Sequence, residues 1–312
     1  MNSLRANTSF IDSNITAVSL RNHLIALLKA LPELTKIKIT ILVTLTTALG
    51  YILAVQHITY EIIFPVTGIF LLACASSVLN HYQERETDAL MQRTCNRPLP
   101  SARVVPEYVL AFSILLLFAG TFILAFLAGI ASAAVGVFTF IWYNFVYTPL
   151  KKQTSFAIIP GSLVGALPPV AGWLAASGSF SDYKIWFVAL YFFIWQIPHF
   201  WLLLMIYGDD YEKAGFPTLN SVFNSLQLKR ITFGWIAAAV VTGSFIPLIT
   251  GVNYAVTAIL LILASIWMFY NSVKFIRADA DRKSVTRTFV MVNFYTLILI
   301  TVLIIDKLWI IM

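Results

Sequence analysis

Three oxygen-bearing side chains recur at helical spacing within one polar stretch of the sequence. Asn80, Glu84 and Asp88 follow one another at intervals of four residues, so on a helix they project from one face, about 6 Å apart per step. A second acidic cluster at residues 209–212 contains Asp210, which we favour as a ligand over its neighbour Asp209. Carboxylate and amide oxygens suit Mg²⁺, which commonly completes its coordination shell with waters and substrate phosphates. The two clusters are therefore candidate magnesium ligands.

Basic side chains accompany both acidic clusters. Lys151 and Lys152 follow the fourth apolar run, and Arg93 and Arg97 lie just beyond Asp88. Acids and bases together favour binding of a metal-bound diphosphate, whose apolar tail would run into a bilayer. The alternative interpretation is a solvated loop with neighbouring salt bridges and, for the two lysines, a pair of topology anchors.

Two histidines are candidate haem ligands or substrate-orienting groups. His199 lies in a Trp-Gln-Ile-Pro-His-Phe-Trp run inside a long apolar segment, and His81 adjoins the acidic ladder. An ionisable residue at membrane depth is a functional candidate, and imidazole can ligate haem iron. A packing role for His199 and a role supporting the ladder for His81 are the alternatives.

The elements that position these residues are predicted to be membrane helices. The chain has 312 residues, of which 59% are hydrophobic and 11% are charged, and its mean hydropathy is +0.84. This composition indicates an all-α, polytopic membrane protein with one span for each run of about twenty apolar residues. The expected spans are residues 36–57, 61–84, 104–122, 124–147, 154–176, 183–207, 229–250, 253–275 and 286–309.

Two of these runs require a break. The third and fourth are nearly continuous, and we expect the chain to turn at Gly120 and Thr121, with Gly129 as the alternative, because one helix through both would overshoot the bilayer about twofold. The fifth run contains Pro160 and Pro168 and is predicted to be kinked or interrupted, as membrane helices are where protein or a cavity covers the freed backbone groups. Residues 1–34 are predicted to be an amphipathic lead-in and residues 35–312 a single membrane domain.

The basic residues test the number of spans. If nine spans cross the membrane in turn, successive loops lie on alternate sides of it. All of the 21 lysines and arginines except Lys184 and Lys307 then fall on the side that carries the N-terminus. By the positive-inside rule this face is cytoplasmic, so we expect a bacterial cytoplasmic membrane with the acidic clusters on its inner side. The basic residues that give the formal charge of +7 therefore flank membrane spans, and this charge does not indicate nucleic-acid binding. With two cysteines, neither a disulfide framework nor a thiolate metal site is supported.

The motifs resemble those of a known family. Asn80-x3-Glu84-x3-Asp88, followed by Arg-Thr-x-Asn-Arg-Pro-Leu from residue 93, resembles the first signature of the UbiA-type intramembrane prenyltransferases, and the second part is closest to their protohaem IX farnesyltransferase branch. Further matches are Tyr-Thr-x2-Lys-Lys at 147–152, Gly-Ala-Leu-Pro-Pro-Val-x-Gly-Trp at 165–173, Trp-x2-Pro-His-Phe-Trp at 195–201 and Asp-Tyr-x2-Ala-Gly-x-Pro at 210–217; Leu-Thr-Lys at 34–36 is weaker.

The resemblance implies nine membrane helices around a central cavity. It implies transfer of the farnesyl group of farnesyl diphosphate to a vinyl group of haem b, with water addition. In that reaction Mg²⁺, held by Asn80, Glu84, Asp88 and Asp210, would neutralise the leaving diphosphate, assisted by Lys151 and Arg97. Glu84 departs from the family pattern, which has aspartate there, and its extra methylene would shift the metal by about 1 Å or place a water between them.

Two other functions are weighed against this one. A prenyltransferase acting on a quinone precursor fits the acidic clusters, although the Pro-His-Phe-Trp and Asn-Arg-Pro-Leu matches argue against it. A secondary transporter would bury its ionisable residues near the bilayer midplane, whereas here they are expected at one face. The expected partners are the two substrates, the lipid bilayer, and haem A synthase or oxidase assembly proteins.

Overall fold

The computed structural model describes residues 21–57, 59–176, 178–277 and 282–309, and all regular elements within these ranges are helices. The first twenty residues of the expected lead-in lie outside the described part. Residues 21–34 form a helix that packs Leu27 and Leu34 against Val78 and Leu99 while Leu28 is exposed. The labelled helices are α2 (Ile37–Val55), α3 (Ile63–Asp88), α4 (Pro106–Ile123), α5 (Ile130–Ile141), α6 (Thr148–Leu150), α7 (Ile158–Gly161), α8 (Leu163–Ala175), α9 (Tyr183–Lys213), α10 (Ser225–Thr250), α11 (Ala255–Arg277) and α12 (Arg282–Leu308).

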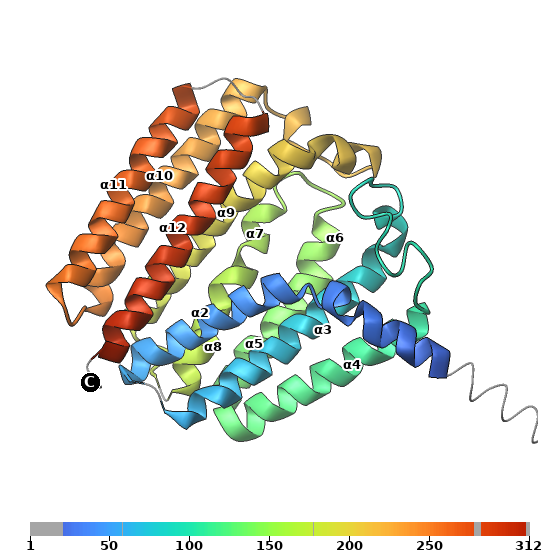
Figure 1. Cartoon of the computed structure of the whole chain (residues 1–312), viewed down its shortest axis with the longest axis horizontal. Coiled ribbons are helices and arrows are strands. Elements are labelled where there is room, and N and C mark those ends of the chain that lie inside the picture. The colour runs from blue at the N-terminus through green and yellow to red at the C-terminus, as the bar shows by residue number, and fades with distance from the viewer. Residues whose placement is uncertain (1–20, 58, 177, 278–281, 310–312) are drawn as a thin grey trace, which may run out of the picture.

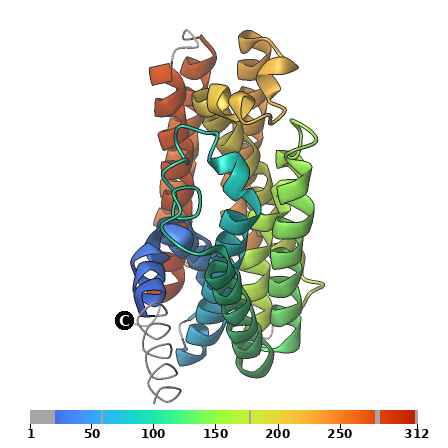
Figure 2. The same cartoon turned by 90° about the vertical axis from the view of Figure 1, so that its right-hand side faces the viewer.

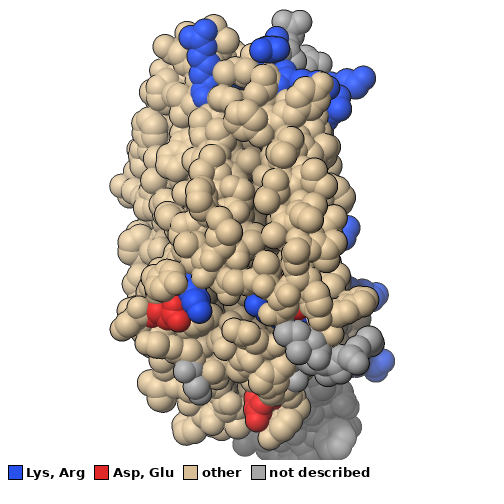
Figure 3. All heavy atoms as spheres, turned by 90° about the vertical axis from the view of Figure 1, so that its left-hand side faces the viewer, with Lys and Arg blue, Asp and Glu red and all other residues tan. Residues whose placement is uncertain are grey.

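Within the described ranges, nine helices are long and apolar enough to cross a membrane, which confirms the number expected from the sequence. The outer surface carries large apolar side chains such as Phe118, Phe122 and Phe126. Figure 3 shows a broad, almost uncharged band across one face, with basic side chains above it and both acidic and basic side chains below it. The chain is therefore a multi-pass integral membrane protein.

The expected break between the third and fourth spans was placed wrongly. The chain turns at Gly129, where φ is 104°, a value that glycine adopts far more readily than other residues. Gly120 instead lies inside α4, where a Cβ atom would come within 2.9 Å of the Gly68 carbonyl oxygen. Its small size serves the contact between α3 and α4, and a glycine in sequence does not distinguish close packing from a turn.

The fifth span is interrupted, as predicted. It consists of α7 and α8, separated at Ser162, and Pro168 and Pro169 lie inside α8. The side-chain oxygen of Gln196 on α9 accepts a hydrogen bond from the Gly165 amide over 3.0 Å. A neighbouring helix thus supplies a partner to the backbone beside the break.

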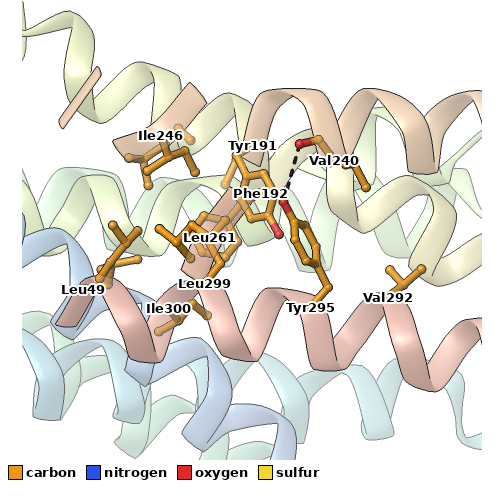
Figure 4. Close-up of a cluster of buried hydrophobic side chains, with 14 of the residues drawn as sticks. Leu49, Tyr191, Phe192, Val240, Ile246, Leu261, Val292, Tyr295, Leu299 and Ile300 are labelled. Atoms are coloured by element: carbon orange, nitrogen blue, oxygen red, sulfur yellow. Dashed lines mark hydrogen bonds between the residues drawn. The ribbon is translucent and has the colours of Figure 1, made fainter. Parts of the chain in front are cut away.

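The helices are arranged as two groups that meet around a cavity. α10, α11 and α12 stand side by side next to α9, while α2, α3, α4, α5 and α8 form the other part (Figures 1 and 2). Buried tyrosines join the first group: the Tyr191 hydroxyl is 2.7 Å from the Thr296 hydroxyl, and Tyr295 lies 2.9 Å from Ser265 and 3.5 Å from the Val240 carbonyl (Figure 4). A cavity of about 470 Å³ is lined by α2, α3, α5, α8 and α9.

The contact between α2 and α8 leaves no room for a side chain at Gly172. A Cβ atom at Gly172 would overlap the Thr47 carbonyl oxygen, whereas Gly234 on α10 has open space beside it. We expect Gly172→Ala to destabilise the protein by about 1–3 kcal/mol, the usual cost of overpacking, and Gly234→Ala to have little effect. Thermal unfolding in detergent, followed by size-exclusion chromatography, measures this difference. Equal melting temperatures for the two variants would contradict the described packing.

Candidate active site

The predicted ladder occupies the last three turns of α3 and is fully buried. Asn80, Glu84 and Asp88 are 1%, 4% and 1% exposed. Buried carboxylates are costly unless they are paired and hydrogen-bonded. The surrounding protein must therefore supply cations to this face of α3.

Three cations from three segments of the chain meet the ladder. The Lys36 ammonium donates to the Asn80 side-chain oxygen over 3.0 Å, and Lys151 Nζ lies 2.5 Å from Glu84 Oε1. Arg97 Nη1 lies 2.7 Å from Asp88 Oδ2. Three basic side chains thus face two carboxylates and one amide, and their N–H groups can also donate to an anionic ligand.

The two lysines differ in how firmly they hold their protons. Burial and the nearby Arg97 guanidinium lower the pKa of Lys36 to about 7. Burial would also lower the pKa of Lys151, but the adjacent Glu84 carboxylate outweighs it and raises that pKa above its usual value. Lys151 is therefore a permanent cation at neutral pH.

The fourth span contains a π-helical stretch at Trp142–Tyr147, just before the residues that it contributes to the site. Such stretches are frequent at functional sites. Asn144 accepts a hydrogen bond at its carbonyl from the Gln83 amide over 3.0 Å, and the Thr148 hydroxyl receives one from the Asn80 amide over 3.3 Å. These contacts fix the end of the fourth span against α3, so that the next turn of chain places Lys151 beside Glu84.

The segment that follows the second acidic cluster packs against the loop that follows the ladder. Met91, just beyond the ladder, packs with Ala214 and Phe216 after α9, and Lys151 Nζ lies 5.9 Å from the Phe216 ring centroid. Asp210 is half-buried at the end of α9. Among the described residues its carboxylate has no ion-pair partner. The exposed Asp209 also makes no ion pair within the described ranges.

The remaining predicted basic residues divide between the cavity and the surface. Arg93 lines the cavity and stacks over the Tyr207 ring at 5.2 Å. Lys152 is exposed and makes no ion pair within the described ranges. Of the four predicted diphosphate-binding residues, Lys151 and Arg97 therefore reach the ladder, Arg93 lies at the cavity, and Lys152 points away.

The two histidines occupy different environments. His81 is 1% exposed, lines the cavity, and neither ring nitrogen has a hydrogen-bond partner among the described residues. His199 lies between α9 and α12, where its Nδ1 atom is 2.7 Å from Asn293 Oδ1 and its ring packs against Trp195 and Phe289. Only His81 directly faces the cavity space.

Lys36 and Thr94 are two residues whose role at the site the sequence did not reveal. A single lysine before an apolar run has the form of a topology anchor, and only the weak Leu-Thr-Lys match pointed to it. Its backbone adopts φ 47° and ψ 49°, which a residue other than glycine rarely adopts and which turns the chain into α2. The buried Thr94 hydroxyl donates to the Asp88 carbonyl over 2.9 Å and holds the loop that carries Arg97.

The donor set fits Mg²⁺ in chemistry. It comprises two carboxylates and an amide oxygen on one helix face, all hard oxygen ligands. The described residues contain no group of three or more histidine, cysteine or acidic side chains arranged to hold a metal alone. Mg²⁺ commonly takes only one or two carboxylates and fills its shell with waters and phosphates, so substrate oxygens would complete such a site.

The fold and the site together define a class: a polytopic helical membrane protein with an apolar cavity beneath a buried cluster of acids and cations. The UbiA prenyltransferase family model matches residues 43–298. The chain belongs to this family.

Curated relatives and solved structures extend this result. The chain is 32% identical over 256 residues to a protoheme IX farnesyltransferase from Solibacter usitatus, covering 78% of this chain and 86% of that protein. It is 32% identical over 285 residues to the enzyme of that name from Flavobacterium psychrophilum, covering 88% and 93%.

Two solved structures share the fold at lower identity. A structure of digeranylgeranylglyceryl phosphate synthase matches with a TM-score of 0.74 at 16% identity, over 90% of this chain and 99% of that one. A UbiA homologue from Archaeoglobus fulgidus bound to DMAPP and Mg²⁺ matches with a TM-score of 0.63 at 14% identity, over 88% and 99%.

The ion pair between Lys151 and Glu84 generates a stability prediction. We expect Lys151→Met to destabilise the protein by about 3–5 kcal/mol, because it leaves a buried carboxylate without its cation. Glu84→Gln in the same chain should restore part of this loss. Unfolding in detergent of the single and double variants measures the coupling.

Lys152→Met is the matched control, since this exposed neighbour should change the free energy of unfolding by no more than about 0.5 kcal/mol. If Lys151→Met and Lys152→Met were equally stable, the ion pair would not contribute as described.

Proposed function

We propose that this chain transfers the farnesyl group of farnesyl diphosphate to a vinyl group of haem b, releasing diphosphate and giving haem O for haem-copper oxidases. The observation that carries the proposal is the buried ladder of α3 with its three cations, placed beside an apolar cavity. The names of the relatives that the chain matches over most of its length support the two substrates.

In this proposal the ladder and its cations bind the diphosphate. Lys151 and Arg97 carry the positive charge that attracts the phosphate oxygens, and Lys36 supplies a further N–H donor. All three are already held in place by Asn80, Glu84 and Asp88. Mg²⁺, held through these three oxygen ligands and Asp210, would neutralise the developing charge of the leaving group. The Archaeoglobus homologue bound to DMAPP and Mg²⁺ supports a divalent metal beside the prenyl diphosphate.

The cavity would hold the farnesyl chain. Its lining includes Ile39, Val43, Ile69 and Leu72, which match an isoprenoid and exclude water from the reacting carbon. Tyr143 and the neighbouring Phe140 and Phe200 also line the cavity, and aromatic faces stabilise an allylic cation through their quadrupoles. These residues bind and orient the chain but supply no nucleophile.

The second substrate attacks the cation through its vinyl group. A carbon–carbon bond forms, the diphosphate leaves with the electrons of the broken carbon–oxygen bond, and water adds to the resulting porphyrin-side cation with loss of a proton. We assign haem binding to His199 and to His81, which lines the cavity and whose ring nitrogens have no hydrogen-bond partner among the described residues. Site and N-terminus would lie on the cytoplasmic side of a bacterial cytoplasmic membrane.

The assay incubates purified protein in detergent with haem b, farnesyl diphosphate and Mg²⁺ and detects farnesylated haem by mass. We expect product only when all three are present, and loss of product on addition of EDTA. No farnesylated haem, together with prenylation of a quinone precursor in a parallel reaction, would overturn the proposal.

Variants of the acids test their assignment. Asp88→Asn and Asp210→Asn should each lower the rate by about 10²–10³-fold, the usual effect of removing one group that stabilises transition-state charge, while the protein stays folded. Asp209→Asn, at the exposed neighbouring position, is the control and should keep most activity. Full activity in either of the first two variants would refute the metal role of that residue.

A further inference from the structure

A basic groove lies on the first three turns of α12, outside the site described above. It has a volume of about 660 Å³ and is lined by Arg282, Lys283, Thr286, Arg287, Val290 and Met291. Spacings of four residues place 282, 286 and 290 in one row and 283, 287 and 291 in the next. Charge therefore occupies the end of the helix, and an apolar floor begins one turn deeper.

The groove adjoins the cavity through a shared aromatic ring. The Arg282 guanidinium lies 5.8 Å from the centroid of Tyr207, and Arg93, which lines the cavity, lies 5.2 Å from the same centroid. Tyr207 thus joins two arginines from distant parts of the sequence.

The next turn of α12 leads from the groove to His199. Phe289 packs its ring 5.0 Å from the ring of His199, and Asn293 contacts Nδ1 of that histidine. His199 is followed by Phe200, which lines the cavity. One surface therefore runs from three cations, over apolar side chains, to a histidine and the cavity wall.

We propose that this groove binds the two propionates of the haem substrate. The inference rests on the proposed function and deepens it by assigning the orientation of the porphyrin. Haem b carries two carboxylates on one edge of an apolar macrocycle and its vinyl groups on the opposite half. With the propionates on Arg282 and Arg287, the macrocycle lies over Val290 and Met291 and its vinyl groups point toward the cavity that holds the farnesyl chain.

Charge and chemistry favour this occupant. The planar guanidinium groups of Arg282 and Arg287 can each present paired donors to a propionate in a bidentate contact. A lipid phosphate also fits a single arginine, but it has no rigid apolar plate to cover the floor of the groove. The paired cations above apolar side chains match a flat dianion better.

The test compares two double variants in phosphatidylcholine nanodiscs. Arg282→Gln with Arg287→Gln removes two of the three groove charges, and Arg230→Gln with Arg277→Gln removes two exposed charges from the neighbouring helices as a control. Each protein is titrated with haem b and with haem dimethyl ester, which lacks the carboxylates, and binding is followed by quenching of tryptophan fluorescence and by the haem absorbance. KM values for haem and for farnesyl diphosphate are measured in parallel.

We expect the groove variant to bind haem b about tenfold more weakly, the combined effect of two partly exposed ion pairs. It should bind the dimethyl ester as the wild-type protein does, and its KM should rise for haem alone. The control variant should resemble the wild type. If the double variant does not fold, either single variant, R282Q or R287Q, is tested in the same way.

The inference would be overturned if the groove variant and the wild type bound haem b equally well, or if the variant lost as much affinity for the dimethyl ester as for haem b. The titrations are also repeated in phosphatidylglycerol nanodiscs. A loss of haem binding that appears only there would identify a lipid site and would also overturn the inference. Wild-type protein that neither binds nor farnesylates haem in any arm would overturn the proposed function itself. If the wild type farnesylates haem and the groove variant binds haem b with unchanged affinity, only the assignment of the propionates to the groove would be overturned.

Discussion

Burial of two carboxylates at the end of one membrane helix is the constraint on which the rest of the structure depends. Glu84 and Asp88 are almost inaccessible, and each needs a cation because an unpaired charge in such a place is strongly destabilising. Lys151 and Arg97 meet this need from opposite sides. The loop after α3 and the turn after the fourth span are therefore held where a diphosphate would require them.

The same constraint links the site to the cavity. Lys36 reaches Asn80 only because the backbone enters α2 through a left-handed residue, and that helix then runs along the cavity wall. The interrupted fifth span contributes Gly165 and Pro168 to this wall, and Gln196 supports its backbone. Charge is thus concentrated at one end of an apolar space, an arrangement that suits a substrate with a diphosphate head and an isoprenoid tail.

Sequence reasoning predicted what depends on local pattern. Span number, the interruption near Pro160 and Pro168, and the single face shared by Asn80, Glu84 and Asp88 all follow from helical periodicity and proline chemistry. The choice of Gly129 over Gly120 as the turn and the partner of each acid could not be predicted, because they depend on helix packing between distant segments. Lys36 was undervalued for the same reason: only contact with Asn80, 44 positions later, distinguishes it from a membrane-flanking lysine.

The central claim is that the α3 ladder receives a metal-bound prenyl diphosphate. A crystal structure with Mn²⁺ and an unreactive thio analogue of farnesyl diphosphate, with Mn²⁺ located by anomalous scattering, tests it most directly. Our account predicts an Mn²⁺ peak in contact with the Asp88 and Asp210 carboxylates, and diphosphate oxygens against Lys36 and Lys151. A peak remote from α3, with the Glu84–Lys151 and Asp88–Arg97 pairs unchanged, would contradict it.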